Sequence, residues 1–132
     1  MSTLKVTNIQ DTSGSNSSTT DEIYSGRAKA WVNFNGTGTV TARDDFNAGS
    51  LTDNGTGDYT ITFDTAFDNA NYMWTGSIMS TSNLTITRSL QLHKPTTTSF
   101  TSPTASNIRV RATDFNNANA TDQEYVTLIV YA

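Results

Sequence analysis

The single histidine is the first residue of this sequence whose side chain could do chemistry. His93 lies beside Lys94 and Pro95, where we expect a strand to end because proline has no amide hydrogen to donate. Catalysis or metal binding would need partners at hydrogen-bonding distance, and no sequence pattern supplies them. We therefore interpret His93 as a surface or packing residue. We expect no catalytic residue, no metal site and no cofactor.

Acidic side chains offer two further arrangements. Asp44 and Asp45 are adjacent, so in a strand they would point to opposite faces and could not act together as acid and base. Asp53, Asp58 and Asp64 gather around a predicted turn and could hold calcium through their oxygen atoms, but their spacing does not match the regular calcium loop. Turns stabilised by aspartate side chains explain the same residues without a metal.

Aromatic side chains could stack on sugar rings wherever they remain exposed. In a fold of packed sheets most of them would be core, so this role depends on the few that are not. The candidates are Trp31, Tyr59, Phe67, Tyr72, Trp74 and Phe100.

Composition limits the classes of function. The chain has 132 residues, which favours one domain, and its net charge of −4 argues against nucleic acid or an anionic membrane surface as a partner. It has no cysteine, which excludes disulfides and thiolate chemistry. No apolar run is long enough to span a bilayer, and the first ten residues lack the core of a signal peptide.

Alternating apolar residues in the stretch 26–72 predict antiparallel strands. Ala30, Val32 and Phe34 share one face of the first run, and Tyr59 and Ile61 share one face of the second. Asn-Gly and a further glycine at 54–57 predict a tight hairpin turn, because glycine tolerates positive φ angles. Similar runs further along raise the count to about seven or eight short strands, which is typical of an antiparallel sandwich.

Two later runs, 72–80 and 124–132, carry apolar residues on both faces. A strand of this kind is covered on both sides, either in the middle of a sheet or at a contact between subunits. An uncovered apolar patch is a liability for a soluble monomer, so these runs predict an oligomer. The interface candidates are Trp74, Met79, Val126, Leu128 and Val130.

The first 26 residues combine a short alternating run, Leu4, Val6 and Ile9, with a polar stretch of small residues. One interpretation is a disordered terminus. The other is an assembly arm that adds its strand to the sheet of another copy or of a larger assembly. Residues 20–24 could form one helical turn capped by Thr19 or Thr20. The loops 96–106 and 114–122, with Phe100 and Phe115, are predicted exposed tips.

The wording of several segments resembles a module of bacteriophage tail-fibre and other virion-surface proteins, including those of phages that infect marine bacteria and cyanobacteria. The resemblance is carried by AWVNFNGTGTV, SLTDNGTGDYTITF and ANY, by LKVTNIQDTSGSN near the start and by EYVTLIVYA at the end. It implies an all-β particle component that is usually trimeric, and it implies no catalytic site.

We therefore expect an all-β, jelly-roll-like antiparallel β-sandwich over residues 27–132 with an extended arm over 1–26, assembled as a homotrimer. The expected function is a non-enzymatic structural protein of the virion, in the tail apparatus or as a head decoration, made in the cytoplasm of the host bacterium. Its partners would be itself, capsid or tail proteins and a host surface glycan. A stand-alone carbohydrate-binding module is the alternative, and a polysaccharide depolymerase would need a cleft with convergent carboxylates that no pair here provides.

Overall fold

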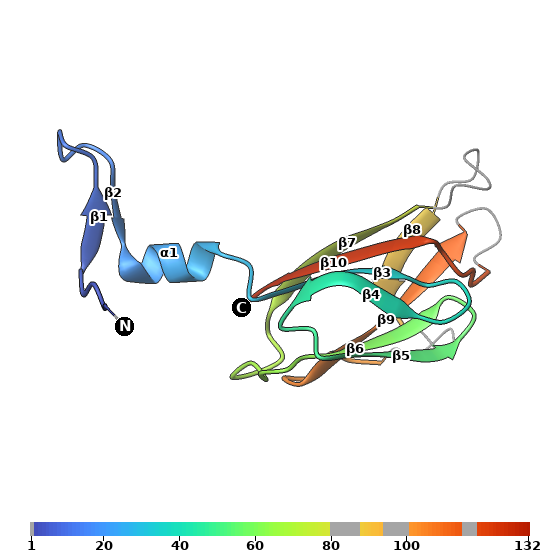
Figure 1. The fold of residues 1–132 in the computed structure, drawn as a ribbon. Coiled ribbons are helices and arrows are strands. Elements are labelled where there is room, and N and C mark those ends of the chain that lie inside the picture. Colours follow the sequence, from blue (N-terminus) through green and yellow to red (C-terminus); the bar gives the residue numbers. More distant parts are fainter. Residues whose placement is uncertain (1, 80–87, 94–100, 115–118) are drawn as a thin grey trace.

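The computed structural model describes residues 2–79, 88–93, 101–114 and 119–132, and it is built around two antiparallel sheets (Figure 1). The first sheet has the strand order β4-β3-β10-β7 and the second has the order β5-β6-β9-β8. We call the two sheets together the sandwich. Its strands are β3 (Ala30–Asn35), β4 (Thr41–Phe46), β5 (Ser50–Gly55), β6 (Asp58–Thr62), β7 (Met73–Met79), β8 (Arg88–Leu92), β9 (Asn107–Asp114) and β10 (Tyr125–Tyr131).

The core lies between the two sheets and follows the predicted alternation. Ala30, Val32 and Phe34 of β3 are buried, and so are Tyr59 and Ile61 of β6. The rings of Phe34 and Tyr59 meet edge to face across the core, with centroids 5.1 Å apart. The all-β prediction is thus confirmed, with the sheets antiparallel throughout.

The predicted hairpin is formed by β5 and β6, and its turn depends on Gly57. This glycine has a φ of +64°, and a Cβ atom there would lie 2.6 Å from the carbonyl oxygen of Ala112. Its amide donates to Asp122 Oδ1 at 2.7 Å, and the Tyr59 hydroxyl donates to the Gly36 carbonyl at 2.8 Å. These contacts tie three loops together at the end of the sandwich that lies away from the N-terminus (Figure 1).

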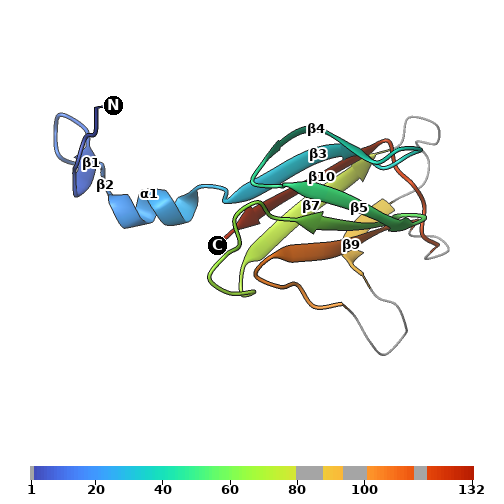
Figure 2. The same ribbon diagram turned by 60° about the horizontal axis from the view of Figure 1, so that its bottom comes forward.

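The N-terminal residues form an arm that stands apart from the sandwich in both views (Figures 1 and 2). The arm consists of the hairpin β1 (Asn8–Gln10) and β2 (Ser17–Thr19), followed by helix α1 (Thr20–Gly26). Thr19 caps the helix, because its side chain accepts from the Glu22 amide while the Glu22 carboxylate accepts from the Thr19 amide. No residue of β1, β2 or α1 is buried.

Lys29 links the arm to the sandwich. Its ammonium group donates to the carbonyl oxygen of Tyr24, in the last part of α1, and lies 3.2 Å from the centroid of the Tyr24 ring. The guanidinium of Arg27 also lies over this ring, at 5.0 Å. A cation that satisfies a carbonyl near a helix C-terminus is favourable for the helix. The arm is therefore attached by a defined contact as well as by the chain itself.

The two strands with apolar residues on both faces lie side by side, and β10 is in the middle of its sheet as predicted. The interface assignment within β10 was wrong, however. Val126, Leu128 and Val130 are buried in the chain's own core, where they contribute to the contact between the sheets. Trp74 of β7 also packs against this core and is partly buried. Of the five interface candidates, Met79 is the one that is exposed.

Candidate functional site

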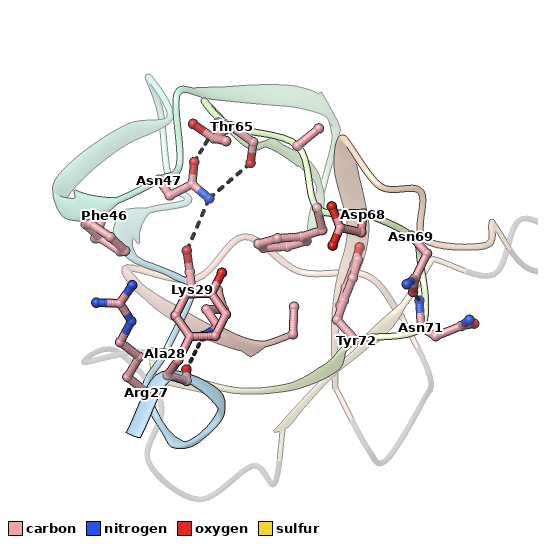
Figure 3. A pocket seen from close by; sticks show the side chains of 14 residues that line it. Arg27, Ala28, Lys29, Phe46, Asn47, Thr65, Asp68, Asn69, Asn71 and Tyr72 are labelled. Atoms are coloured by element: carbon pink, nitrogen blue, oxygen red, sulfur yellow. Dashed lines mark hydrogen bonds between the residues drawn. The ribbon is translucent and has the colours of Figure 1, made fainter. Parts of the chain in front are cut away.

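A pocket of about 330 Å³ lies where the arm meets the end of the sandwich (Figure 3). Four separate parts of the chain supply its walls: the end of α1 with the residues that lead into β3, the end of β4 with its link to β5, the link between β6 and β7, and the residue that follows β10. It is lined by Tyr24, Arg27, Ala28, Lys29, Phe46, Asn47, Thr65, Ala66, Phe67, Asp68, Asn69, Asn71, Tyr72 and Ala132.

Asn47 holds three of these segments in place. Its Nδ2 donates to the carbonyl oxygens of Lys29 and Thr65, both at 3.1 Å, and its Oδ1 accepts from the Thr65 amide at 2.6 Å. The backbone of Asn47 has a φ of +54°, a left-handed conformation that asparagine tolerates better than most residues. Figure 3 shows this bridge at one edge of the pocket.

An aromatic cluster forms a second wall. Phe67 and Tyr72 both contact the buried ring of Phe63, with centroids 4.5 and 5.8 Å away, and their own rings are 5.1 Å apart. The Tyr72 hydroxyl donates to the carbonyl oxygens of Thr104 and Asn107 at 3.1 and 3.2 Å. Burial raises the pKa of Tyr72 to about 12, so this hydroxyl stays protonated at neutral pH.

Polar groups that the fold does not use surround these rings. Among the described residues, the Asp68 carboxylate and the Asn71 side chain have no hydrogen-bond partner, and the Arg27 guanidinium, which lies over the Tyr24 ring, has no hydrogen bond or ion pair. Asn69 uses its Oδ1 to accept from the Asn71 amide, which leaves its Nδ2 available. Figure 3 shows Arg27 on one side of the pocket and Asp68, Asn69 and Asn71 on the other.

His93 has partners that no sequence pattern indicated. It is buried, its Nε2 lies 3.1 Å from Asp58 Oδ2, and its Nδ1 lies 3.0 Å from the Thr101 hydroxyl. Arg109 binds the same carboxylate through two atoms, Nε at 2.9 Å and Nη2 at 2.7 Å. Burial lowers the pKa of His93; the charges of Arg109 and Arg111 act in the same direction, and Asp58 opposes them.

This network joins a hydroxyl, an imidazole and a carboxylate, which are the groups of a nucleophilic triad. Its geometry favours a structural role instead, because Asp58 is already engaged by the guanidinium fork of Arg109. His93 and Thr101 also line neither the end pocket nor a second, shallower cavity on the first sheet. The network connects β6, β9 and the segment that follows β8.

On the side that faces away from the core, the first sheet carries apolar residues in two groups, separated by the polar row Asn33, Thr127 and Ser77. Register places Trp31 opposite Ile129, Tyr131 opposite Met73, and Tyr125 opposite Met79. Met73 and Met79 are 64% and 51% exposed, and the Arg43 guanidinium lies 4.2 Å from the centroid of the Tyr125 ring. We call this surface the outer face: Trp31, Met73, Met79, Tyr125, Ile129 and Tyr131.

The remaining predicted residues fall in three places. Leu4, Val6 and Ile9 of the arm are exposed. Phe100 and Phe115 lie outside the described residues. In the loop 96–106, which was predicted as an exposed tip, Ser102, Thr104 and Ser106 are exposed, and the Ala105 carbonyl accepts from the Phe67 amide. Asp122, at the end of the other loop, lies at the end of the sandwich away from the arm.

Of the six aromatic candidates for stacking on sugars, Tyr59 is fully buried, whereas Phe67 and Tyr72 line the pocket. Asn47, Asp68 and Arg27 carried no signal in the sequence, since only the fold brings their segments together.

No cluster of histidine, aspartate and glutamate side chains within the described ranges is arranged to hold a metal ion. None of the helices in that part of the chain combines the length and the hydropathy needed to cross a membrane. Comparison with protein-family models, with curated proteins and with solved structures found no match for this chain.

Proposed function

We propose that this chain is a non-enzymatic structural module on the surface of a bacteriophage particle, made in the cytoplasm of the host bacterium. Its place is in the tail fibre or receptor-binding apparatus, or on the head as a decoration protein. The resemblance of the sequence to virion-surface proteins supports the assignment to a phage particle, and the arm is the structural observation on which the proposal rests. Capsid or tail proteins are the partners that an attachment arm would bind.

The arm supports attachment because it has regular structure but nothing of its own to pack against. Leu4 is 84% exposed, and Ile9, Ile23 and Tyr24 are also exposed. An isolated two-stranded hairpin is at most marginally stable in water. An arm with exposed apolar side chains and its own helix cap is therefore suited to docking on another protein, which would bury these side chains.

The outer face supports contact between copies of the chain. It places methionine and aromatic side chains on a broad sheet surface, and uncovered apolar patches of this kind mark interaction sites. We propose that copies associate through this face as a homotrimer. Three copies and jelly-roll-like connectivity are the finer parts of the sequence prediction, and both remain predictions.

Sedimentation of a charged outer-face variant tests this assembly. The double variant Met73→Lys/Met79→Lys would place two charges in the contact. We therefore expect its oligomer mass in solution to fall below the oligomer mass of the unmodified protein. The matched control is Ser50→Lys/Thr52→Lys, which adds the same charges at exposed positions of β5 in the other sheet. A methionine variant that keeps the full mass of the unmodified oligomer would contradict the outer face as the contact.

A further inference from the structure

We propose that the pocket between the arm and the sandwich binds a single uncharged sugar unit, such as the terminal residue of a glycan. The inference goes beyond the structural role and does not depend on it. It rests on the size of the pocket, on its aromatic walls and on the polar groups that the fold leaves available.

The walls suit the apolar faces of a sugar ring. A cavity of about 330 Å³ is at the small end of ligand pockets. Phe67 and Tyr72 supply ring surface on one side, and Phe46, which is 54% exposed, lies on the other. A pyranose offers C–H groups that pack on such rings, while its hydroxyls point outward from the ring edge.

The polar groups select the class of ligand. Asp68 can only accept hydrogen bonds when ionised, Arg27 can only donate them, and Asn71 can do both. A wholly apolar ligand would remove these groups from water without replacing their hydrogen bonds, at a cost in binding. Lys29 also lines the pocket, but its ammonium is already held by the carbonyl oxygen and the ring of Tyr24. Of the two charged groups left for a ligand, Asp68 would repel an anion and Arg27 would repel a cation. A neutral polyol satisfies both charged groups at once.

The pocket is also held in place before any ligand arrives. Asn47 fixes the links on either side with three hydrogen bonds, and the Phe63, Phe67 and Tyr72 rings brace one another. Pre-organised walls reduce the loss of conformational entropy on binding. Because Tyr24 of α1 is one of the walls, a bound sugar would also contact the arm.

The test is an NMR titration of the full chain, labelled with ¹⁵N, against D-glucose, D-galactose, D-mannose and N-acetyl-D-glucosamine, with sodium acetate as an anionic probe. We expect at least one sugar to shift the amides of Asn47 and of residues 65–72 with a saturable curve and a Kd on the order of 1–10 mM. Asp68→Ala should weaken this binding about tenfold, since it removes a charge-assisted hydrogen bond.

Asp45→Ala is the matched control, because Asp45 is an exposed aspartate of β4 that does not line the pocket. It should bind as the unmodified chain does. Absence of saturable shifts with all four sugars, equal binding by Asp68→Ala, or saturation by acetate instead of a sugar would each overturn the proposal. Light scattering on the same samples separates the two proposals: loss of sugar binding with an oligomeric mass counts against the pocket alone, and a single-chain mass counts against the assembly.

Discussion

Phe34 in β3 is completely buried, whereas Leu4 in the arm is 84% exposed. The sandwich and the arm both have regular, locally well-formed backbones, but they differ in what their side chains contact. The sandwich buries apolar residues of both sheets in one core, and the arm buries none. Regular secondary structure alone therefore does not make a segment self-sufficient, and the arm has the properties of a segment completed by a partner.

The largest effect is expected from removing a large core ring, which should destabilise the sandwich and leave the arm unchanged. We expect Phe34→Ala to lower the free energy of unfolding of the sandwich by about 3–5 kcal/mol, because it opens a cavity and loses the contact with Tyr59. Chemical denaturation followed by tryptophan fluorescence measures this change. Hydrogen exchange of the amides of residues 20–26 should be the same in the variant as in the unmodified chain; a parallel loss in both regions would contradict their independence.

Asn47 should stabilise the junction between the arm and the sandwich. Asn47→Ala removes three hydrogen bonds and leaves a left-handed backbone without the residue that tolerates it, so we expect a loss of about 2–3 kcal/mol. Asn47→Gly removes the same bonds without the backbone strain and should cost less. If both variants unfold at the same denaturant concentration, the backbone conformation contributes nothing and the bonds account for the whole effect.

His93 should make the sandwich, but not the arm, sensitive to mild acid. Its pKa is lower in the folded chain than in the unfolded chain, so the unfolded state binds more protons in the window between the two values. Its contribution to stability is complete above about pH 6.5 and is lost as the pH falls through the folded pKa. Melting temperatures measured between pH 7.5 and 5 should fall, and His93→Gln should flatten this slope.

The opposite result for His93 would be informative. A melting temperature that rises as the pH falls toward 5 would mean that protonation strengthens the contact with Asp58 more than burial and the two arginines oppose it. The network would then be an ion pair with the imidazolium, and its present description would be wrong.

The smallest change in overall stability is expected from a substitution in the arm. Thr19→Ala removes one half of the capping box and should destabilise α1 by about 1 kcal/mol. Hydrogen exchange should speed up for the amides of residues 20–26, while the melting temperature of the sandwich stays unchanged. A lower melting temperature of the sandwich, or faster exchange in β3 or β10, would show that the arm stabilises the sheets.

Sequence patterns predicted those elements whose two faces differ in polarity. β3 and β6 alternate clearly, so their inward residues were identified correctly. β10 is apolar on both faces, and alternation alone cannot say whether Val126, Leu128 and Val130 or their neighbours Tyr125, Ile129 and Tyr131 face the core. Val126, Leu128 and Val130 were therefore assigned to the wrong face of β10.

Most of the candidate site could not be predicted from the sequence. Asn47 and Asp68 lie in links whose proximity depends on how β4, β5, β6 and β7 are arranged in two sheets. Asp58 and His93 are 35 positions apart, and they meet only because β6, β9 and β8 are neighbours. Phe67 and Tyr72 could be selected as aromatic residues, but their exposure could not be read from local spacing.

The mass of the chain in solution tests the central claim most directly. Light scattering should give three times the chain mass of 14.3 kDa for the full chain, and the same number of copies after residues 1–26 are removed, because in the proposed assembly the outer face joins the copies and the arm is free to attach them elsewhere. A full chain that has the mass of a single copy would contradict the account. An oligomer that falls apart when the arm is removed would move the contact between copies from the outer face to the arm.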